Sequence, residues 1–455
     1  MKLRELLSNP GVRVHFIGIG GVSMAQLAEL LHKSGHFVSG SDMQDSQRVG
    51  DLEALGIEIS TVHDGSLIGD AKVCVRSAAI RDDNAEVLQA KALGIPLYER
   101  AELLGAIMTA YEYSVCVAGT HGKTTTSSML THIATTADRS PTAFIGARTP
   151  TQPKGFCLGD SNLMITESCE YYNSFLHFHP KISLILNIEY DHQDFFSDLG
   201  AVLDAFRQFA KNTPEDGILL INGACPNCRE ALDGMKYKTF GLAESDNVQA
   251  TNIMWDKGCA SFDVTVDGRF YAHVALSVPG DFNMLNALGA LGVAQMLGIP
   301  GQEAAVALQS FRSAERRMEL KGRCNDAWVY DDYAHHPTAV ELTLNAVREM
   351  GFNAVRVVFQ PHLYSRTAQM LNEFAEALRL ADSVIVADIY AAREPDEGIV
   401  SSAKLAALIP GARAVSDFGE IAEILRKEVQ PNDLILTMGA GDAYQVGEML
   451  VVNNV

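Results

Sequence analysis

The chain has 455 residues, enough for about three domains of ordinary size. Its 36 basic and 56 acidic residues give a formal net charge of −20, which excludes a general electrostatic attraction to nucleic acid or anionic membranes. No apolar run approaches the roughly 20 residues of a membrane span, and the first residues lack the pattern of a secretory signal. We therefore expect a cytoplasmic protein with neither nucleic acid nor a membrane as partner.

Strands and helices alternate through three successive stretches, a pattern typical of βαβ units and parallel sheets. In the first stretch, strands are predicted at 12–17, 37–39, 73–75 and 95–97, with a helix at 24–31. In the second, strands are predicted at 113–118, 163–166 and 182–186, with an antiparallel insertion that includes 270–278 and a helix from 283 to 297. In the third, strands are predicted at 328–330, 355–359, 383–387 and 434–437. The predicted fold class is therefore α/β, with three consecutive doubly wound domains at 1–109, 110–312 and 313–455.

A glycine-rich segment follows an apolar strand in the second stretch and opens a helix: Gly119-Thr120-His121-Gly122-Lys123-Thr124-Thr125. Glycines let backbone N–H groups close around phosphate oxygens, and the helix N-terminus adds positive potential. Lys123 would place a cation on the phosphates, and the Thr124 hydroxyl would bind Mg²⁺. The spacing differs from GxxxxGK[ST], because Val117 stands where that pattern has its first glycine. The alternative is a glycine turn with a surface lysine, but the strand–loop–helix context favours a nucleotide site.

Candidate metal ligands follow two later strands of the same stretch. Glu167 ends the strand at 163–166, and Asp191-His192 follows the next strand, after Asn187. Carboxyl ends of parallel strands line the ligand crevice of an open α/β sheet. Each residue alone is more typical of a helix cap or a loop. Together, in the domain that carries the phosphate loop, they indicate metal ligands.

A second glycine-rich turn, Gly18-Ile19-Gly20-Gly21-Val22-Ser23, joins the first predicted strand to a helix. Asp42 lies about twenty residues further on, as a dinucleotide-binding motif requires, but Ser23 replaces the third glycine. The motif is weak support for NAD and better support for a phosphate or pyrophosphate. The alternative is a tight turn without a ligand. Two phosphate-type loops suggest an enzyme that joins ATP chemistry to a nucleotide-bearing substrate.

The eight cysteines are dispersed, and several lie inside apolar runs, as buried reduced thiols do. Cys225 and Cys228 form one CxxC pair with no second pair near it. A structural zinc site needs four ligands, so we interpret these two residues as ordinary thiols rather than as a zinc site.

Six motifs, taken together and in order, resemble those of the Mur ligases, the ATP-dependent amide-forming enzymes of peptidoglycan synthesis. The resemblance spans essentially the whole chain. The motifs are Gly119 to Thr125, Glu167, Asn187 with Asp191-His192, Asn283-x-x-Asn286, Arg316-Arg317-Met-Glu319 and Asp332-Tyr-Ala-His-His-Pro337.

The resemblance implies an N-terminal Rossmann-like domain for a UDP substrate, a central P-loop-type ATP-binding domain and a C-terminal Rossmann-like domain for an amino acid. Three segments, 15–24, 331–337 and 359–367, favour the family member that joins L-alanine to UDP-N-acetylmuramate. The cofactors would be ATP and Mg²⁺, and the protein a monomer or weak homodimer. The alternative member attaches a recycled murein tripeptide to the same sugar nucleotide, but its N-terminal loop usually reads Gly-Ile-Cys-Gly-Thr.

The resemblance also implies residue roles. The catalytic set would be Lys123, Glu167, His192, Arg317 and His336, with Mg²⁺ ligands from Thr124, Glu167 and His192. ATP would contact Gly119, Thr120, His121, Gly122, Lys123, Thr124, Thr125, Asn283, Asn286, Arg317 and Asp332. The substrates would contact Gly18, Ile19, Gly20, Gly21, Ser23, Asp42, Ser77, His336 and Arg366.

Two functions from other classes remain as alternatives. A nicotinamide dehydrogenase would use the first glycine loop, but it leaves the second loop unexplained. An ATP-gated sensor or scaffold would bind ATP without transferring its phosphate to an acceptor. The metal and third-domain motifs argue against both.

Overall fold

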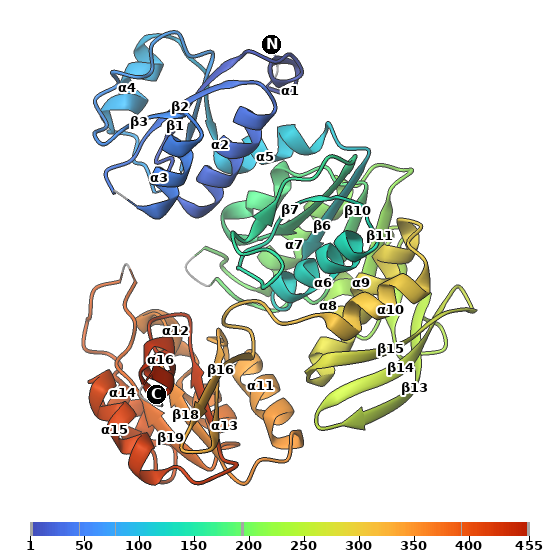
Figure 1. Cartoon of the computed structure of the whole chain (residues 1–455), viewed down its shortest axis with the longest axis vertical. Coiled ribbons are helices and arrows are strands. Elements are labelled where there is room, and N and C mark those ends of the chain that lie inside the picture. Colours follow the sequence, from blue (N-terminus) through green and yellow to red (C-terminus); the bar gives the residue numbers. More distant parts are fainter. Residues whose placement is uncertain (1–2, 45, 78, 193–194, 393, 453–455) are drawn as a thin grey trace. The chain divides into compact units, whose positions relative to one another are not determined.

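The computed structural model describes residues 3–44, 46–77, 79–192, 195–392 and 394–452. The chain divides into two compact units. Figure 1 shows the elements of the chain, coloured along the sequence. The first unit comprises Met1–Lys123, Asp138–Gly146 and Lys154–Thr239, and the second comprises Thr124–Ala137, Ala147–Pro153 and Phe240–Val455. Among the described residues, no helix is long and apolar enough to cross a membrane.

The first unit begins with a five-stranded, fully parallel sheet in the order β3-β2-β1-β4-β5. Central strand β1 is an apolar run whose Val14, Phe16 and Ile17 are fully buried, as expected for a parallel sheet covered by helices. The strands are β1 (Arg13–Ile17), β2 (Phe37–Ser41), β3 (Glu58–Ser60), β4 (Val73–Arg76) and β5 (Leu97–Glu99). The helices are α1 (Leu3–Leu7), α2 (Val22–Lys33), α3 (Gln47–Ala54), α4 (Ala85–Ala92) and α5 (Arg100–Met108).

Six further strands of the first unit follow the order β11-β10-β6-β9-β7-β8. The pairs of β6 with β9 and β10, of β7 with β9 and of β10 with β11 are parallel, and β8 is antiparallel to β7. The chain leaves β6 toward β7 on one side and later crosses to β10 on the other, so β6 is the topological switch point where open α/β sheets bind ligands. The strands are β6 (Tyr113–Ala118), β7 (Thr142–Phe144), β8 (Phe156–Cys157), β9 (Leu163–Ser168), β10 (Ile182–Ile185) and β11 (Ile218–Asn222), and the helices are η1 (Tyr171–His177), α7 (Leu199–Lys211) and α8 (Pro226–Ala231).

In the second unit, β13, β14 and β15 form an antiparallel meander, and β15 confirms the predicted antiparallel insertion. The first two of these strands were not among the predicted ones. The predicted helix at 283–297 is α9. The elements are α6 (Lys123–Thr136, from Thr124 onward in this unit), β12 (Lys238–Gly241, from Phe240 onward in this unit), β13 (Val248–Asp256), β14 (Cys259–Val266), β15 (Arg269–Pro279), α9 (Asp281–Met296) and α10 (Gly301–Ser310).

The third sheet, also in the second unit, has the order β16-β17-β21-β18-β19-β20 and is parallel except for β16. Antiparallel edge strand β16 was not predicted. The strands are β16 (Glu319–Cys324), β17 (Ala327–Asp332), β18 (Val355–Phe359), β19 (Ser383–Val386), β20 (Arg413–Ala414) and β21 (Leu434–Met438). The helices are α11 (Pro337–Glu349), α12 (Tyr364–Gln369), α13 (Leu371–Leu378), α14 (Ser402–Ala407), α15 (Phe418–Glu428) and α16 (Tyr444–Val452). The α/β fold class is thus confirmed, whereas the domain boundaries near 109 and 313 stay predictions.

Candidate functional site

The phosphate loop lies where the sequence predicts it, between the end of β6 and the start of α6. Gly119 and Gly122 have φ angles of 142° and 82°, a region that side-chain-bearing residues rarely adopt. A Cβ at Gly119 would also approach the Asn187 carbonyl oxygen to 3.1 Å. The two glycines are therefore required by the backbone path of the loop.

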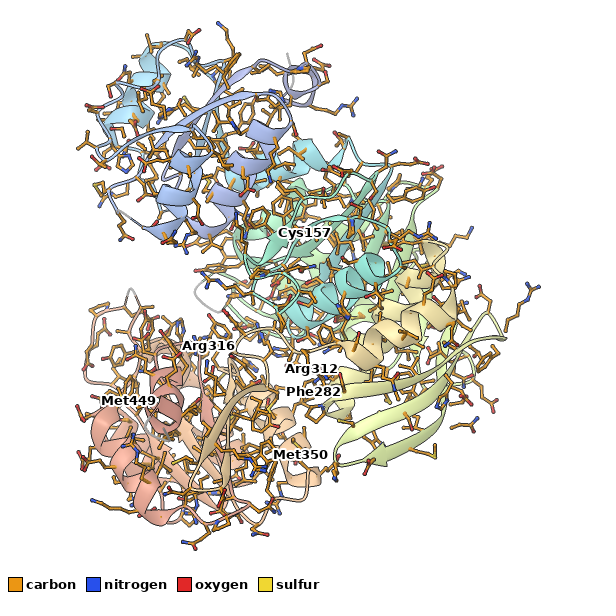
Figure 2. All side chains as sticks on the ribbon, in the orientation of Figure 1. Cys157, Phe282, Arg312, Arg316, Met350 and Met449 are labelled. Carbon is orange, nitrogen blue, oxygen red and sulfur yellow. The ribbon has the colours of Figure 1, made fainter. Side chains whose placement is uncertain are left out.

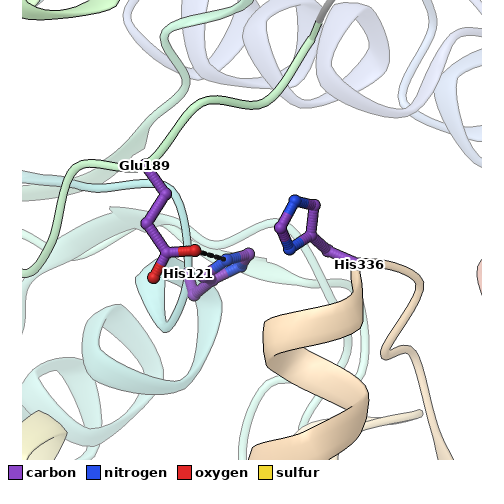
Figure 3. A group of neighbouring side chains, drawn as sticks. All are labelled: His121, Glu189 and His336. Atoms are coloured by element: carbon purple, nitrogen blue, oxygen red, sulfur yellow. Dashed lines mark hydrogen bonds and ion pairs between the residues drawn. The ribbon is translucent and has the colours of Figure 1, made fainter. Parts of the chain in front are cut away.

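Asn187, which follows β10, fixes this loop with both ends of its side-chain amide. Its Oδ1 accepts the His121 N–H at 2.7 Å, and its Nδ2 donates to the His121 carbonyl oxygen at 3.1 Å. The Thr120 N–H donates to the Asn187 carbonyl oxygen at 3.1 Å. The His121 imidazole also faces the Glu189 carboxylate (Figure 3), and its Nε2 lies 3.3 Å from Oε2 of Glu189. The loop is thus held in shape by the residues after β10.

Lys123 is held by a buried carboxylate that the sequence analysis did not select. Its Nζ lies 3.0 Å from Oε2 of Glu170, donates to the Thr120 carbonyl oxygen at 3.1 Å and also bonds the Gly119 carbonyl oxygen. Burial opposes the charge on Lys123, but Glu170 outweighs it and raises the pKa of Lys123 well above its ordinary value. The ammonium is therefore charged and aimed at the loop.

Glu170 also pairs with His192, whose imidazole lies 3.6 Å away. Burial would lower the pKa of His192, but hydrogen bonds to Cys169 and Glu170 and the charge of Asp191 raise it to about 9. Its backbone N–H donates to Asp191 at 2.7 Å, and its ring stacks on Tyr171 with centroids 4.4 Å apart. The first unit thus brings Lys123 and His192 to one carboxylate.

Glu167 is fixed by the backbone of a neighbouring turn. The Gly146 N–H, which follows β7, donates to Oε2 of Glu167 at 3.0 Å. A Cβ at Gly146 would lie only 2.6 Å from the same oxygen. The glycine therefore lets the main chain approach the carboxylate predicted to bind Mg²⁺.

The second unit carries the rest of the predicted ATP and amino-acid set. Thr124 and Thr125 are buried in the first turn of α6, and Arg317 donates to the Thr124 hydroxyl at 3.4 Å. Asp332, at the end of β17, accepts the Met318 and Ala334 N–H groups at 2.8 and 2.9 Å.

Asp332 is buried, and its neighbours oppose the cost of burying its charge. Burial raises the pKa of Asp332, and the Arg317 guanidinium acts against this rise. Arg317 also lies over the Tyr333 ring, 5.0 Å from its centroid. Arg317 thus interacts with both Thr124, a predicted magnesium ligand, and Asp332, a predicted ATP contact.

Both predicted asparagines are buried on α9. Asn283 donates to the Pro279 carbonyl oxygen at 2.7 Å, and Asn286 donates to Oδ1 of Asn283 at 3.3 Å. Each side-chain amide therefore donates a hydrogen bond to another residue of the second unit. The bond from Asn283 ties the start of α9 to the end of β15.

The predicted amino-acid contacts lie at two helices of the third sheet. His336, labelled in Figure 3, directly precedes α11 and is buried. Arg366 is buried on α12, and its Nη1 lies 3.4 Å from Nδ1 of His362.

The N-terminal glycine turn satisfies most of its own N–H groups. Gly18 and Ile19 donate to the Ser41 carbonyl oxygen at 2.8 and 3.0 Å, and Gly20 donates to the Asp42 carboxylate at 2.9 Å. Gly21 begins α2 as its N-cap, and Ser23 lies in the first turn of that helix. Ser77, the residue after β4, donates its N–H to the Ile17 carbonyl oxygen at 3.2 Å. The structure thus brings the predicted substrate contacts of the first glycine turn together. Asp42 hydrogen-bonds the turn itself, through the Gly20 N–H.

A buried polar network supports the end of β2. The Ser41 hydroxyl bonds the Glu86 carboxylate, which lies 3.2 Å from Nε2 of His15 and 2.9 Å from Nδ1 of His63.

All eight cysteines of the chain are free thiols.

Three family models match the chain in succession. They are described as the Mur ligase family catalytic domain at residues 13–112, the Mur ligase middle domain at 117–294, and the Mur ligase glutamate ligase domain at 316–441. The three matches follow the order of the three sheets.

Individual relatives are similar over nearly the full length. A UDP-N-acetylmuramate–L-alanine ligase of Caldanaerobacter subterraneus is 42% identical, covering 97% of this chain and 98% of its own. The crystal structure of the UDP-N-acetylmuramate–alanine ligase from Thermotoga maritima has a TM-score of 0.78 at 27% identity, covering 96% and 98% of the two chains. A murein peptide ligase from Psychrobacter arcticus, at 24% identity, has a TM-score of 0.68 and covers 98% and 99%. The chain belongs to the Mur ligase family.

Proposed function

We propose that this protein joins L-alanine to the lactyl carboxylate of UDP-N-acetylmuramate and converts ATP to ADP and phosphate. The observation that carries the proposal is the full-length similarity, at 42% identity, to a relative with this named activity. The fixed phosphate loop with a charged Lys123 gives the chemical support.

A carboxylate is a poor electrophile, so the first step activates it by transferring the γ-phosphoryl group of ATP, which gives an acyl phosphate and ADP. Lys123 and Arg317 would offset the negative charge that collects during the transfer. Thr124 and Glu167 offer the hydroxyl and carboxylate oxygens that Mg²⁺ prefers and would hold it, together with His192 once its imidazole has lost its proton. Bound Mg²⁺ supplies Lewis-acid stabilisation of the phosphate oxygens.

In the second step, the amine of L-alanine attacks the acyl phosphate, an amide bond forms and phosphate leaves. Arg366 would bind the carboxylate of the amino acid, because a guanidinium pairs with a carboxylate through two parallel hydrogen bonds. The amine must lose a proton, and His336 is our candidate for the base. The UDP portion would contact the segment from Gly18 to Ser23, with Asp42 and Ser77.

The alternative product is the tripeptide conjugate formed by murein peptide ligases. The relative that is 42% identical over nearly the full length is named for the L-alanine reaction. This supports L-alanine as the acceptor.

The deciding experiment measures phosphate release from ATP and Mg²⁺ with UDP-N-acetylmuramate, adding one acceptor at a time. We expect release that requires both the sugar nucleotide and free L-alanine, with the amide product detected by mass. Release with L-alanyl-γ-D-glutamyl-diaminopimelate but not with L-alanine would reassign the protein to the tripeptide branch. Release with neither acceptor would refute the proposed reaction.

A further inference from the structure

The buried polar network of the N-terminal sheet gathers side chains from three strands and a helix. His15 of β1 is paired in register with Ser39 of β2, and Ser41 lies two residues further along β2, so these three side chains point to one face of the sheet. Helix α4 carries Glu86 in its first turn, and the loop after β3 brings His63 to the same carboxylate. The network therefore lies at the end of β2.

Glu86 is the acceptor at the centre of this network. It is only 1% exposed, so its charge must be compensated inside the sheet and its helices. Oε1 lies 3.2 Å from Nε2 of His15, Oε2 lies 2.9 Å from Nδ1 of His63, and the Ser41 hydroxyl also donates to Oε2. Burial raises the pKa of Glu86, but these three donors outweigh burial and hold the pKa below its ordinary value. Glu86 is therefore an ionised carboxylate that accepts three hydrogen bonds.

Ser41 connects the network to the first glycine turn. Its side chain is bonded within the network, whereas its carbonyl oxygen accepts the Gly18 and Ile19 N–H groups at 2.8 and 3.0 Å. The next residue, Asp42, accepts the Gly20 N–H at 2.9 Å. Two consecutive residues at the end of β2 thus hold three successive amides of the turn, and the buried carboxylate fixes the first of these two residues.

We propose that Glu86 is a positioning residue for the sugar-nucleotide substrate. Through Ser41 it holds the first glycine turn and the Asp42 carboxylate in the arrangement that binds the uridine diphosphate portion. Because Glu86 is buried, it acts through Ser41 and not by touching the substrate. The proposal rests on the proposed function, which assigns this portion of the substrate to the turn.

Two substitutions interrupt the connection at different points. Ser41→Ala removes the hydroxyl that joins the carboxylate to the end of β2. Glu86→Gln keeps the shape of the side chain but replaces charge-assisted hydrogen bonds with weaker neutral ones. A turn loosened in this way is competent to bind for only part of the time, and the apparent affinity falls in proportion.

The first measurement follows hydrogen exchange of backbone amides in the full chain without ligand. In Ser41→Ala, the amides of residues 18–20 should exchange about tenfold faster than in the wild type, the effect of losing one buried hydrogen bond. Glu86→Gln should change the exchange in the same direction. The phosphate loop at 119–125 should keep its exchange rate in both variants, which distinguishes a local effect from general loosening. Because Glu86 acts through Ser41, the double variant should match Ser41→Ala alone.

Glu29→Gln is the matched control for the loss of a buried carboxylate. Glu29 is also buried on a helix of the N-terminal sheet, but it pairs with Lys33 and Lys154 and not with the end of β2. Its variant should leave the exchange at residues 18–20 unchanged.

The second measurement compares substrate affinities. Calorimetry with UDP and the steady-state KM for UDP-N-acetylmuramate should both show about a tenfold weakening in Ser41→Ala and a weakening in the same direction in Glu86→Gln. The kcat and the KM for ATP should stay at their wild-type values, because ATP is assigned to the phosphate loop. A general loss of stability would not produce this selective change.

The two measurements separate this proposal from the proposed function. Unchanged exchange at residues 18–20 in folded Glu86→Gln would overturn the positioning role of Glu86, and should that variant not fold, unchanged exchange in Ser41→Ala would do so. Faster exchange with an unchanged affinity for UDP would overturn the role in substrate binding. A wild-type protein that binds no UDP would refute the substrate in the proposed function, while the exchange rates would still decide whether Glu86 fixes the turn.

Discussion

The Nζ atom of Lys123 lies 3.0 Å from a carboxylate oxygen of Glu170, and the two side chains are only 11% and 3% exposed. The lysine that we propose to receive phosphate groups is therefore already paired with an internal anion. Because buried charges are costly unless they are paired, Glu170 keeps the ammonium charged and ordered in the loop. Glu170 acts through Lys123, which makes it a positioning residue.

Lys123→Ala should lower ligase turnover by at least about a hundredfold, because the cation on the transferring phosphate is lost. It should also lower the free energy of unfolding by about 3–5 kcal/mol, since Glu170 is left buried without its main partner. Calorimetry and the phosphate-release assay measure the two effects.

The control for this variant is Lys181→Ala, which removes a pair with Asp216 at the surface and should change neither quantity noticeably. The double variant Lys123→Met with Glu170→Gln removes both charges and should regain most of the lost stability without regaining turnover. Near-normal turnover in folded Lys123→Ala or in the folded double variant would contradict the assignment of Lys123.

Gly146→Ala should weaken the response to Mg²⁺ and leave the fold intact. The added Cβ would lie 2.6 Å from the Glu167 carboxylate, so this flexible side chain must move. We expect the Mg²⁺ concentration at half-maximal rate to rise by about tenfold, the loss of roughly one ligand interaction. Gly50→Ala in α3 is the control, because its Cβ would meet nothing within 4 Å. An unchanged Mg²⁺ titration in Gly146→Ala would argue against Glu167 as a ligand.

Two adjacent arginines should respond differently to truncation. Arg316, labelled in Figure 2, lies 3.2 Å from the buried Asp331 and donates to the Gly439 carbonyl oxygen at 2.6 Å. Arg317 instead bonds Thr124. Arg316→Ala should therefore lower the melting temperature more than Arg317→Ala does, whereas Arg317→Ala should reduce turnover more, by about a hundredfold. The reverse pattern would show that the roles are exchanged.

Alkylation of Cys225 should have an unusual pH dependence. With a pKa of about 6, its thiolate fraction is half at pH 6 and nearly complete above about pH 7. The rate of reaction with iodoacetamide should therefore rise with pH and level off near neutrality. Cys259, whose pKa is raised, should still accelerate above pH 9. Peptide mass mapping gives both rates, and parallel profiles for the two residues would contradict the assigned acidity.

The parts that the sequence predicted correctly depend on local pattern. The apolar run at 113–118 and the glycines after it determine strand, loop and helix from neighbouring residues alone, and β6 and α6 lie there. Edge strand β16 was missed because it contains Glu319, Lys321 and Arg323, the charged residues typical of an exposed edge rather than of a core strand.

Glu170 was missed for a different reason. It lies after β9, in a turn where Tyr172 and Asn173 have positive φ angles, and its partner is 47 residues earlier in the chain. No regular spacing in the sequence connects Glu170 with Lys123, so the sequence alone does not predict that the two side chains pair. The one available signal was a second acidic residue three positions after Glu167.

The Asp42 carboxylate already accepts the Gly20 N–H in the first glycine turn, so this turn contains its own internal anion. A free phosphate arriving there would be repelled by that charge and would find the amide of Gly20 occupied. What Asp42 can still attract is a hydrogen-bond donor, such as a ribose hydroxyl or the imide N–H of a uracil ring. The N-terminal domain should therefore discriminate by nucleoside rather than by phosphate, and inorganic pyrophosphate should compete poorly where uridine competes well.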